Sequence, residues 1–329
     1  PLAWRHPSAQ TASMQILLLG CSGLVGRELV PLLLGQGHRL SLLSRQARPL
    51  AAIADPQLER VQGDPSQAAT WQRSEVQAAL ASAEAVINLA GEPIADKRWT
   101  AAQRQLLFDS RVATTAHLVA ALGVLAAQPE LPRPQVLING SAIGYYGTSA
   151  SERFGEASPA GSDLLGRLCL AWEAEAQKAS ELCRLVILRT GIVLAADGGA
   201  LGKMLPVFRA GFGGPIGSGQ QWMSWISRRD FCRLIATALE DPSYSGPYNA
   251  VAPEPCSMAS FASQLGRVLG RPSLLPVPGP ILQLLLGDGA QVVLEGQHVR
   301  PERLQERGFV YETPDLKAAL AVATSPAPH

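Results

Sequence analysis

Three glycines, each separated from the next by two residues, lie between a short apolar run and an amphipathic segment. They are Gly20, Gly23 and Gly26, in the spacing GxxGxxG. In dinucleotide-binding loops the first glycine permits a tight turn, the second lets the backbone approach the pyrophosphate, and the third allows close helix packing. The following helix N-terminus supplies N–H donors and a positive dipole end. A loop that needs glycine only for its shape has the same residues. The expected strand before the loop and helix after it favour dinucleotide binding, with Ser22 in the phosphate turn.

The position about 20 residues beyond this loop distinguishes NAD from NADP, because NAD-selective proteins carry a carboxylate there for the ribose 2′-hydroxyl. Here the residues are Ser44 and Arg45. A guanidinium can bind a 2′-phosphate with two hydrogen bonds, so the sequence favours NADP as the cofactor. The alternative is that Arg45 is a solvated loop cation. Asp64, after the third expected strand, either accepts the adenine amino group or caps the next helix.

Small residues end the fourth expected strand, in the run Asn88-Leu89-Ala90-Gly91. Leu89, Ala90 and Gly91 would let the backbone lie directly against a cofactor. Arg111 falls in a long expected helix, Thr100 to Leu125, in which an arginine ordinarily faces solvent. An inward-facing Arg111 would need an anionic partner.

A hydroxyl and two phenols follow the fifth expected strand. Ser141 closes Asn139-Gly140-Ser141, and Tyr145 and Tyr146 follow in Gly144-Tyr145-Tyr146-Gly147. A substrate would meet a nicotinamide at this end of the sheet, so these three residues are the candidate catalytic residues. The alternative is that the two tyrosines pack in the interior with hydrated hydroxyls.

These motifs need a scaffold in which strands alternate with helices. The helical spacing of apolar residues from Leu24 to Leu34 predicts a helix directly after the glycine loop. Helical patterns also separate most of the expected strands. The alternation predicts an α/β fold with a Rossmann-type doubly wound parallel sheet, whose strand ends bring the motifs into one crevice. The expected strands are Gln15–Leu19, Arg39–Leu43, Arg60–Gln62, Ala85–Leu89, Val136–Ile138 and Leu185–Leu188.

The chain has 329 residues, more than a typical single domain. Its composition changes near Asp197, where glycine-rich loops begin. We therefore expect a smaller C-terminal substrate region after the Rossmann domain. The expected divisions are a disordered extension (1–13), an NADP-binding Rossmann domain (14–195), a substrate region with return elements to that domain (196–275), a C-terminal helical module (276–322) and a tail (323–329).

Composition excludes several classes of function. The formal net charge of +1 gives no basic footprint for nucleic acid. No apolar run approaches the ~20 residues of a membrane-spanning helix. Five scattered cysteines without a CxxC pair indicate reduced thiols and no metal site. A cytoplasmic protein is the expectation, with the plastid stroma as the alternative if residues 1–13 are the remnant of a transit segment.

Taken together, the motifs resemble those of the extended and atypical short-chain dehydrogenase/reductases. More narrowly, the chain resembles the epimerase-family proteins of the nucleoside-diphosphate-sugar epimerase or SulA-like cell division inhibitor type. The stretches that carry this resemblance include Asn88-Leu89-Ala90-Gly91-Glu92-Pro93-Ile94, Ser141 to Gly147, Trp172-Glu173, Leu188 to Leu194, Gly213 to Gly219 and Leu294-Glu295-Gly296-Gln297. The resemblance implies NADP binding through Ser22, Gly23, Leu24, Val25, Ser44, Arg45, Leu89, Ala90, Arg111 and Val193.

The superfamily's acid–base pair is Tyr-x3-Lys, followed four residues later by Glu. With Glu175 set at that glutamate, Ala171 takes the lysine position and Arg167 the tyrosine position. The tyrosine must transfer a proton near neutral pH with the help of the lysine cation. Alanine and arginine cannot do this, although Arg167 would partly replace the missing cation.

Two functions therefore compete. The first is an NADP-dependent epimerase or reductase with a non-standard active site, acting on a nucleotide-linked sugar or a carbonyl compound. The second is a non-catalytic NADP(H)-binding regulatory protein linked to cell or plastid division. A small molecule is the expected partner in the first case, and the sequence indicates no oligomeric state.

Overall fold

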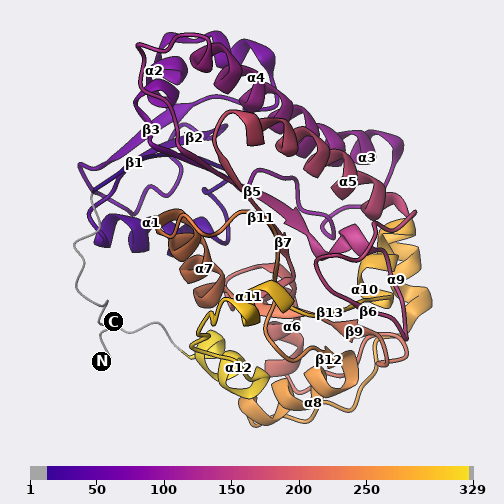
Figure 1. Ribbon diagram of the computed structural model, residues 1–329. Coiled ribbons are helices and arrows are strands. Elements are labelled where there is room, and N and C mark those ends of the chain that lie inside the picture. Colours follow the sequence, from indigo (N-terminus) through magenta and orange to yellow (C-terminus); the bar gives the residue numbers. More distant parts are fainter. Residues whose placement is uncertain (1–12, 326–329) are drawn as a thin grey trace.

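The computed structural model describes residues 13–325 and is built around one parallel sheet (Figure 1). The strand order is β11-β7-β5-β4-β1-β2-β3, and every neighbouring pair is parallel. This confirms the Rossmann-type doubly wound fold. The strands are β1 (Gln15–Leu19), β2 (Arg39–Ser44), β3 (Leu58–Gln62), β4 (Ala85–Asn88), β5 (Val136–Ala142), β7 (Arg184–Thr190) and β11 (Gly246–Ala250).

The edge strand β11 was not predicted. Its sequence begins Gly246-Pro247, and proline lacks the N–H that an interior strand needs. An edge position tolerates it, because β11 pairs on one side only, where Tyr248 lies opposite Leu188 of β7. The strand comes from residues 196–275 and so returns that region to the main sheet.

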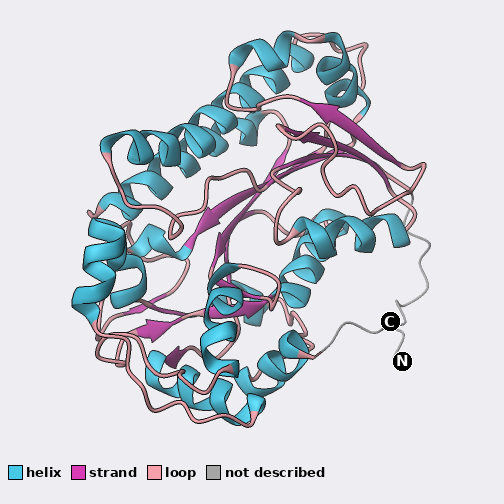
Figure 2. Cartoon of the chain, turned by 180° about the vertical axis from the view of Figure 1, so that it is seen from behind, coloured by secondary structure: helices cyan, strands magenta, loops and turns pink. Residues whose placement is uncertain are grey.

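Helices cover both faces of the sheet, as Figure 2 shows. Alternate residues of β1 point to opposite faces, so Ile16 and Leu18 pack in one core and Leu17 and Leu19 in the other. Both faces are therefore apolar, as in a buried parallel sheet. The first face is covered by α1 (Gly26–Gly35) and α7 (Arg228–Glu240), and the second by α2 (Ser74–Ser82), α4 (Thr114–Ala126) and α5 (Leu164–Gln177).

The long helix expected from Thr100 to Leu125 is divided. Thr100 caps α3 (Ala101–Phe108), its hydroxyl oxygen accepting from the N–H of Gln103. A π-helical turn over Asp109–Ala113 then separates α3 from α4. This turn, a feature frequent at functional sites, carries Arg111, which is buried rather than facing solvent.

The later part of the chain forms a smaller region with its own core. Its members include Leu201, Leu205, Phe261 and Leu320. Helices α6 (Gly199–Arg209), α8 (Met258–Leu269) and α12 (Leu316–Thr324) supply this core. The other helices of this part of the chain are α9 (Gly279–Leu286), α10 (Gln291–Leu294) and α11 (Glu302–Glu306), and α11 packs against β11 of the main sheet. The short strands are β6 (Arg153–Phe154), β8 (Ile192–Leu194), β9 (Trp222–Met223), β10 (Trp225–Ser227), β12 (Cys256–Ser257) and β13 (His298–Val299).

The C-terminal module folds back onto the site end of the sheet. Strand β13 pairs with β6, the next strand after β5 in the chain, and α12 packs against α8. Helix α12 runs to Thr324, two residues into the expected tail. The rest of the expected tail and extension, residues 326–329 and 1–12, lies outside the described residues.

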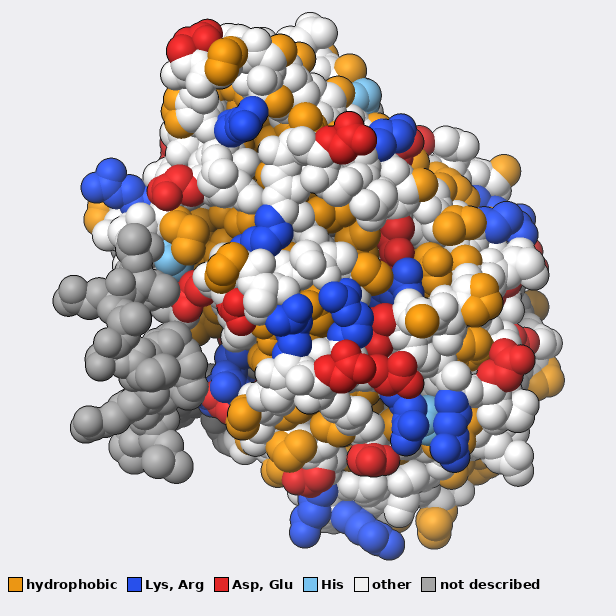
Figure 3. Space-filling view, viewed as in Figure 1, with side chains coloured by type: hydrophobic (Ala, Val, Ile, Leu, Met, Phe, Trp, Pro, Cys, Tyr) orange, Lys and Arg blue, Asp and Glu red, His pale blue; other side chains and the backbone are white. Residues whose placement is uncertain are grey.

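The face in Figure 3 mixes Lys and Arg with Asp and Glu, without a broad surface of one sign. Within residues 13–325, no helix is long and apolar enough to cross a membrane. The same part of the chain has no cluster of three or more His, Cys, Asp or Glu side chains that could hold a metal ion.

Candidate functional site

The glycine loop forms a cradle at the carboxyl end of β1. Gly20 has a φ of +71°, and a Cβ there would lie 2.3 Å from the nitrogen of Ala90. A Cβ on Gly26 would lie 1.7 Å from the carbonyl oxygen of Cys21, so both positions require glycine. Gly23 is exposed, and a Cβ there would have no neighbour within 4 Å. The open space over Gly23 fits close approach of a pyrophosphate.

Helix α1 begins at Gly26, not at Leu24 as predicted. Leu24 and Val25 belong to the turn, with Val25 at the N-cap position. Gly198 and Gly199 pack against Leu24, since a Cβ on Gly198 would lie 2.9 Å from its Cδ1. A Cβ on Gly199 would lie 3.6 Å from the carbonyl oxygen of Val193. Leu24, Val25 and Val193 therefore lie on neighbouring segments beside the cradle.

The end of β4 lies against the same loop. The N–H of Leu89 donates to the carbonyl of Leu19 at 2.9 Å, and the N–H of Ala90 donates to Asn88 Oδ1 at 3.2 Å. A Cβ on Gly91 would lie 2.8 Å from Cζ of Arg111. The small residues at 90 and 91 therefore allow close contact with the loop and with Arg111.

Arg111 is a buried cation without an ion pair among the described residues. Its guanidinium donates to the carbonyls of Glu92 (2.9 Å) and Leu107 (3.3 Å), and its Cζ lies 5.4 Å from the centroid of the Trp172 ring. Burial lowers the pKa of Arg111 to about 10. Removal from water penalises the charged form, so a nearby anion would stabilise this side chain.

Ser44 and Arg45 lie at the end of β2, as the motif predicts. The Ser44 hydroxyl accepts from the N–H of Gln46 at 3.2 Å. Arg45 is 62% exposed, and its Nη2 lies 4.0 Å from Oε2 of Glu92, whose Oε1 also pairs with Lys97 at 2.9 Å. No site role was predicted for Glu92, named only as part of the Asn88–Ile94 stretch, or for Lys97, because neither belongs to the glycine or Ser-Arg motifs. An exposed guanidinium held only loosely is able to turn toward a phosphate.

Asp64 has a local partner. Its Oδ1 accepts from the N–H of Ser66 at 3.0 Å and from the Ser66 hydroxyl at 2.7 Å. This turn precedes a 3₁₀ helix over Ala68–Gln72. The carboxylate therefore stabilises the turn before that helix, whose N-cap residue is Gln67 and has no side-chain cap.

The three candidate catalytic residues surround one buried arginine, Arg189 of β7. Tyr146 donates to Asn249 Oδ1 at 2.7 Å and accepts from Arg189 Nη1 at 2.9 Å. The Tyr145 ring centroid lies 3.5 Å from Cζ of Arg189. Ser141 donates to Oε1 of Glu173 at 2.6 Å, and Glu173 forms an ion pair with Arg189. Burial raises the pKa of Tyr146 to about 12, which makes it a poor acid near neutral pH.

The buried position of Glu173 corrects the expected register of α5. Glu175 lies on the outer side of the helix and pairs with Lys178 at 2.7 Å. Because Glu173 faces the sheet, the Tyr-x3-Lys-x3-Glu pattern ends at Glu173 and places Leu165 at the tyrosine position and Cys169 at the lysine position. The Trp172-Glu173 run, one of the stretches that carry the family resemblance, is the sequence feature that indicates this register.

Arg167 does not replace the missing cation. Its side chain is exposed and donates to the carbonyl of Ser162. Residues four apart on a helix share a face, so positions 165, 169 and 173 lie on the side toward the sheet. Residue 167 is two positions away from 165 and 169 and therefore lies on another face of the helix.

A cavity of about 220 Å³ lies at the carboxyl ends of β5 and β7. Leu165 and Cys169 line it, which agrees with the corrected register. Burial raises the pKa of the Cys169 thiol to about 12. Ser141, Tyr145 and Tyr146 are absent from its lining. The lining residues are Ile94, Ala142, Ile143, Gly144, Thr148, Asp163, Leu165, Cys169, Thr190, Gly191, Ile192, Trp222, Ser224, Gln291, Val292, Glu295 and Gln297.

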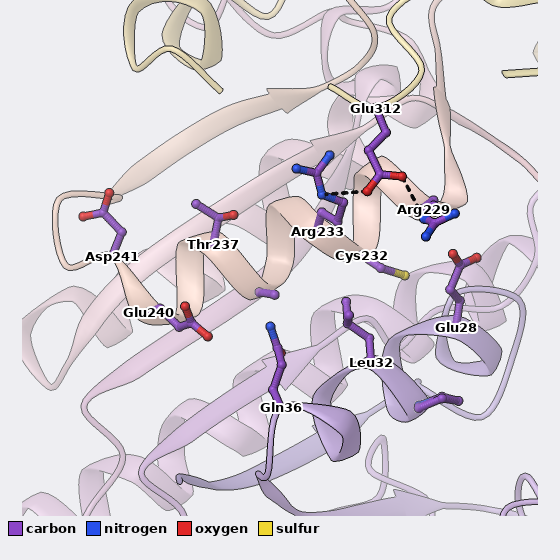
Figure 4. A pocket seen from close by; sticks show the side chains of 12 residues that line it. Glu28, Leu32, Gln36, Arg229, Cys232, Arg233, Thr237, Glu240, Asp241 and Glu312 are labelled. Carbon is purple, nitrogen blue, oxygen red and sulfur yellow. Dashed lines mark ion pairs between the residues drawn. The ribbon is translucent and has the colours of Figure 1, made fainter. Parts of the chain in front are cut away.

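A second groove, of about 520 Å³, lies between α1 and α7 (Figure 4). Glu312 enters it and pairs with Arg229 at 2.8 Å and with Arg233 at 3.4 Å. Cys232 and Leu32 line the space between the two helices. This groove is walled by helices rather than by strand ends, so it is separate from the dinucleotide cradle.

The sheet order and glycine cradle define a dinucleotide-binding protein of the short-chain dehydrogenase/reductase type. The chain belongs to the NAD dependent epimerase/dehydratase family, whose sequence model matches residues 16–251. A domain of unknown function, DUF1731, matches residues 277–323.

Named relatives cover nearly the whole chain. It is 40% identical to the chloroplastic SDR39U1 homolog of Arabidopsis thaliana, an epimerase family protein, over 95% of this chain and 87% of that one. It is 36% identical to human SDR39U1, over 93% of this chain and 98% of the relative.

Among solved structures, human SDR39U1 (isoform 2) with NADPH has a TM-score of 0.82 at 35% identity, covering 94% of this chain and 99% of that one. The nucleoside-diphosphate sugar epimerase of Corynebacterium glutamicum has a TM-score of 0.71 at 28% identity, covering 94% of this chain and 58% of that one.

Proposed function

We propose that this protein is an NADP(H)-dependent reductase or epimerase whose proton transfer does not use a Tyr–Lys pair. The cavity at the ends of β5 and β7 carries the proposal, because it leaves room for a substrate where the strand ends meet the cofactor crevice. A cavity filled by side chains would have supported binding of the cofactor alone.

NADP(H) fits the residues of the crevice. The pyrophosphate would lie over Gly23, whose side faces open space, at the N-terminus of α1. Arg45 would bind the 2′-phosphate, and the solved structure of human SDR39U1 contains NADPH. The same resemblance supports contacts from Ser44, Arg111 and Val193.

When bound, NADPH supplies a hydride to a carbonyl carbon, and a proton must reach the carbonyl oxygen. The hydroxyls that line the cavity already donate within the protein: Thr148 to Glu295, Thr190 to the Leu188 carbonyl and Ser224 to the Gln297 carbonyl. We therefore assign the proton to solvent, and we expect slow turnover, since a positioned general acid contributes about 10²–10⁴-fold.

The test measures hydride transfer directly. The purified protein is incubated with NADPH deuterated at C4 and a panel of carbonyl compounds, and separately with NADP+ and nucleotide-linked sugars. Products are analysed by mass spectrometry for deuterium and by NMR for epimers. We expect deuterium to be incorporated slowly into at least one compound. Val292→Trp fills the cavity and should abolish this incorporation, whereas Val310→Trp, at a 72% exposed position, should not. No incorporation into any carbonyl compound, together with no epimer of any nucleotide-linked sugar, would sink the proposal.

The second candidate is a non-catalytic NADP(H)-binding regulatory protein. Leu165 and Cys169, in the acid and lysine positions, favour it, because neither side chain can transfer the required proton. In cells lacking the protein, a Val292→Trp copy would then restore the phenotype while an Arg45→Asp copy would not. Restoration by neither variant, with both proteins folded, would favour the catalytic function instead.

A further inference from the structure

The cavity at the ends of β5 and β7 has a lining without cations. Its charged members are Asp163 and Glu295, and no Lys, Arg or His belongs to the described lining. Asp163 Oδ1 accepts from the N–H of Gly166 at 2.7 Å, as the cap of α5. Glu295 Oε2 accepts from Thr148 Oγ1 at 2.6 Å and from Gln291 Nε2 at 3.0 Å. The charge in this lining is negative.

A hollow that adjoins this cavity is also without cations in its lining. An adjoining hollow of about 430 Å³ shares Thr148, Trp222 and Glu295 with it, which makes the two spaces neighbours. Its lining contains no lysine, arginine or histidine. The other residues of that hollow are Ser149, Ala150, Ser218, Gln220, Gln221, Leu294 and Gly296.

Because the two spaces share three lining residues, we take the adjoining hollow as the space for the diphosphate and nucleoside of a nucleoside-diphosphate sugar whose sugar lies in the cavity. A diphosphate is a dianion, and proteins recognise such groups with arginine, lysine or helix N-termini. Here the carboxylate of Glu295, which lines both spaces, would repel it instead. Electrostatics therefore opposes this substrate class.

The size of the cavity also opposes a nucleoside-diphosphate sugar as its ligand. Its volume of about 220 Å³ lies below the roughly 300–1,000 Å³ of pockets that hold drug-sized ligands. The C-terminal module contributes Gln291, Val292 and Gln297 to its lining. Gln297 is fixed there, because its Nε2 donates to the Ile143 carbonyl at 3.0 Å.

We infer that this cavity takes a small uncharged carbonyl compound, or the corresponding alcohol, and does not take a nucleoside-diphosphate sugar. The inference rests on the proposed function for its carbonyl chemistry. The apolar part of the ligand lies against Ile94, Leu165 and Val292. A small ligand fits within the volume that the C-terminal module leaves in the cavity.

The experiment measures binding, not turnover. Protein saturated with NADPH, as checked by nicotinamide fluorescence, is exposed to cyclohexanone, benzaldehyde, UDP-glucose and UDP, and binding is followed by ligand-observed NMR. We expect at least one of the two carbonyl probes to bind, and Val292→Trp to weaken this binding at least tenfold. Val310→Trp, in the same module, should leave it unchanged. UDP-glucose and UDP should give no signal that Val292→Trp removes.

Two results would overturn the inference. One is binding of UDP-glucose or UDP that Val292→Trp abolishes and Val310→Trp preserves. The other is the absence of cavity-dependent binding by both carbonyl probes. Failure of the proposed function has a different signature, since a carbonyl probe would then bind in the cavity while no deuterium passes from the labelled NADPH.

Discussion

The carboxylate of Glu173 and the guanidinium of Arg189 form a buried ion pair with two hydrogen bonds, Nε to Oε1 and Nη2 to Oε2, both 2.8 Å long. The pair joins α5 to β7. Ser141 donates to the carboxylate, and Tyr146 accepts from the guanidinium. This one ion pair therefore holds two of the three candidate catalytic residues, Ser141 and Tyr146, by hydrogen bonds.

Replacement of Arg189 by leucine should destabilise the protein strongly. The change leaves the Glu173 carboxylate buried without its cation, which costs about 3–5 kcal/mol in comparable sites. Chemical denaturation followed by circular dichroism measures the free energy of unfolding. Lys178→Met is the control, because it breaks the exposed pair with Glu175 and should cost less than about 1 kcal/mol. Equal losses in the two variants would contradict this account.

The sequence predicted most of the sheet, because buried parallel strands are continuous apolar runs between helical patterns. It missed β11, whose glycine and proline are unfavourable in a strand and are tolerated only at an edge. It left the orientation of Arg111 open, with solvent as the ordinary direction, since helical periodicity carries no sign of the π-helical turn in which this residue lies. Backbone irregularity is set by tertiary packing and is not encoded in residue spacing alone.

The cofactor motifs were found where predicted because each is local: a loop and strand ends. The alignment of α5 with the Tyr-x3-Lys-x3-Glu pattern depended on whether Glu173 or Glu175 faces the sheet. The structure shows that Glu173 does. Its partner Arg189 comes from a distant strand. The lining from residues 291–297 was likewise beyond prediction, as it depends on how the C-terminal module folds back.

Two glycines of the loop should respond differently to alanine. Gly26→Ala places a methyl group 1.7 Å from the Cys21 carbonyl oxygen and should destabilise the fold by at least about 1–3 kcal/mol. Gly23→Ala meets nothing within 4 Å, so unfolding should change by less than about 0.5 kcal/mol. Its methyl group instead occupies the expected pyrophosphate site, and NADPH binding by fluorescence titration should weaken at least tenfold. Full affinity in a folded Gly23→Ala protein would place the pyrophosphate elsewhere.

Arg45→Asp should weaken NADPH binding about 10–100-fold, because a charged hydrogen-bonded partner of the 2′-phosphate is worth about 1.5–3 kcal/mol. NADH lacks that phosphate, so its affinity should not fall. Isothermal titration with both nucleotides gives the comparison. Arg48→Asp, at an exposed position in the same loop, is the matched control for net charge. An equal loss in the two variants would show a general charge effect, and the role of Arg45 would be wrong.

Glu156 should make stability depend on pH in a defined direction. Burial raises the pKa of this carboxyl, although its Oε1 accepts from the N–H groups of Asn249 and Arg303. A raised folded-state pKa means that the folded protein binds the proton more tightly than the unfolded chain, so stability falls as pH rises from the usual carboxyl pKa through the raised value. Glu156→Gln does not titrate. Urea unfolding between pH 4.5 and 7 should therefore show wild type gaining stability relative to this variant as the pH falls. Glu152→Gln, at an exposed position, should follow wild type. Parallel curves for wild type and Glu156→Gln would contradict the prediction.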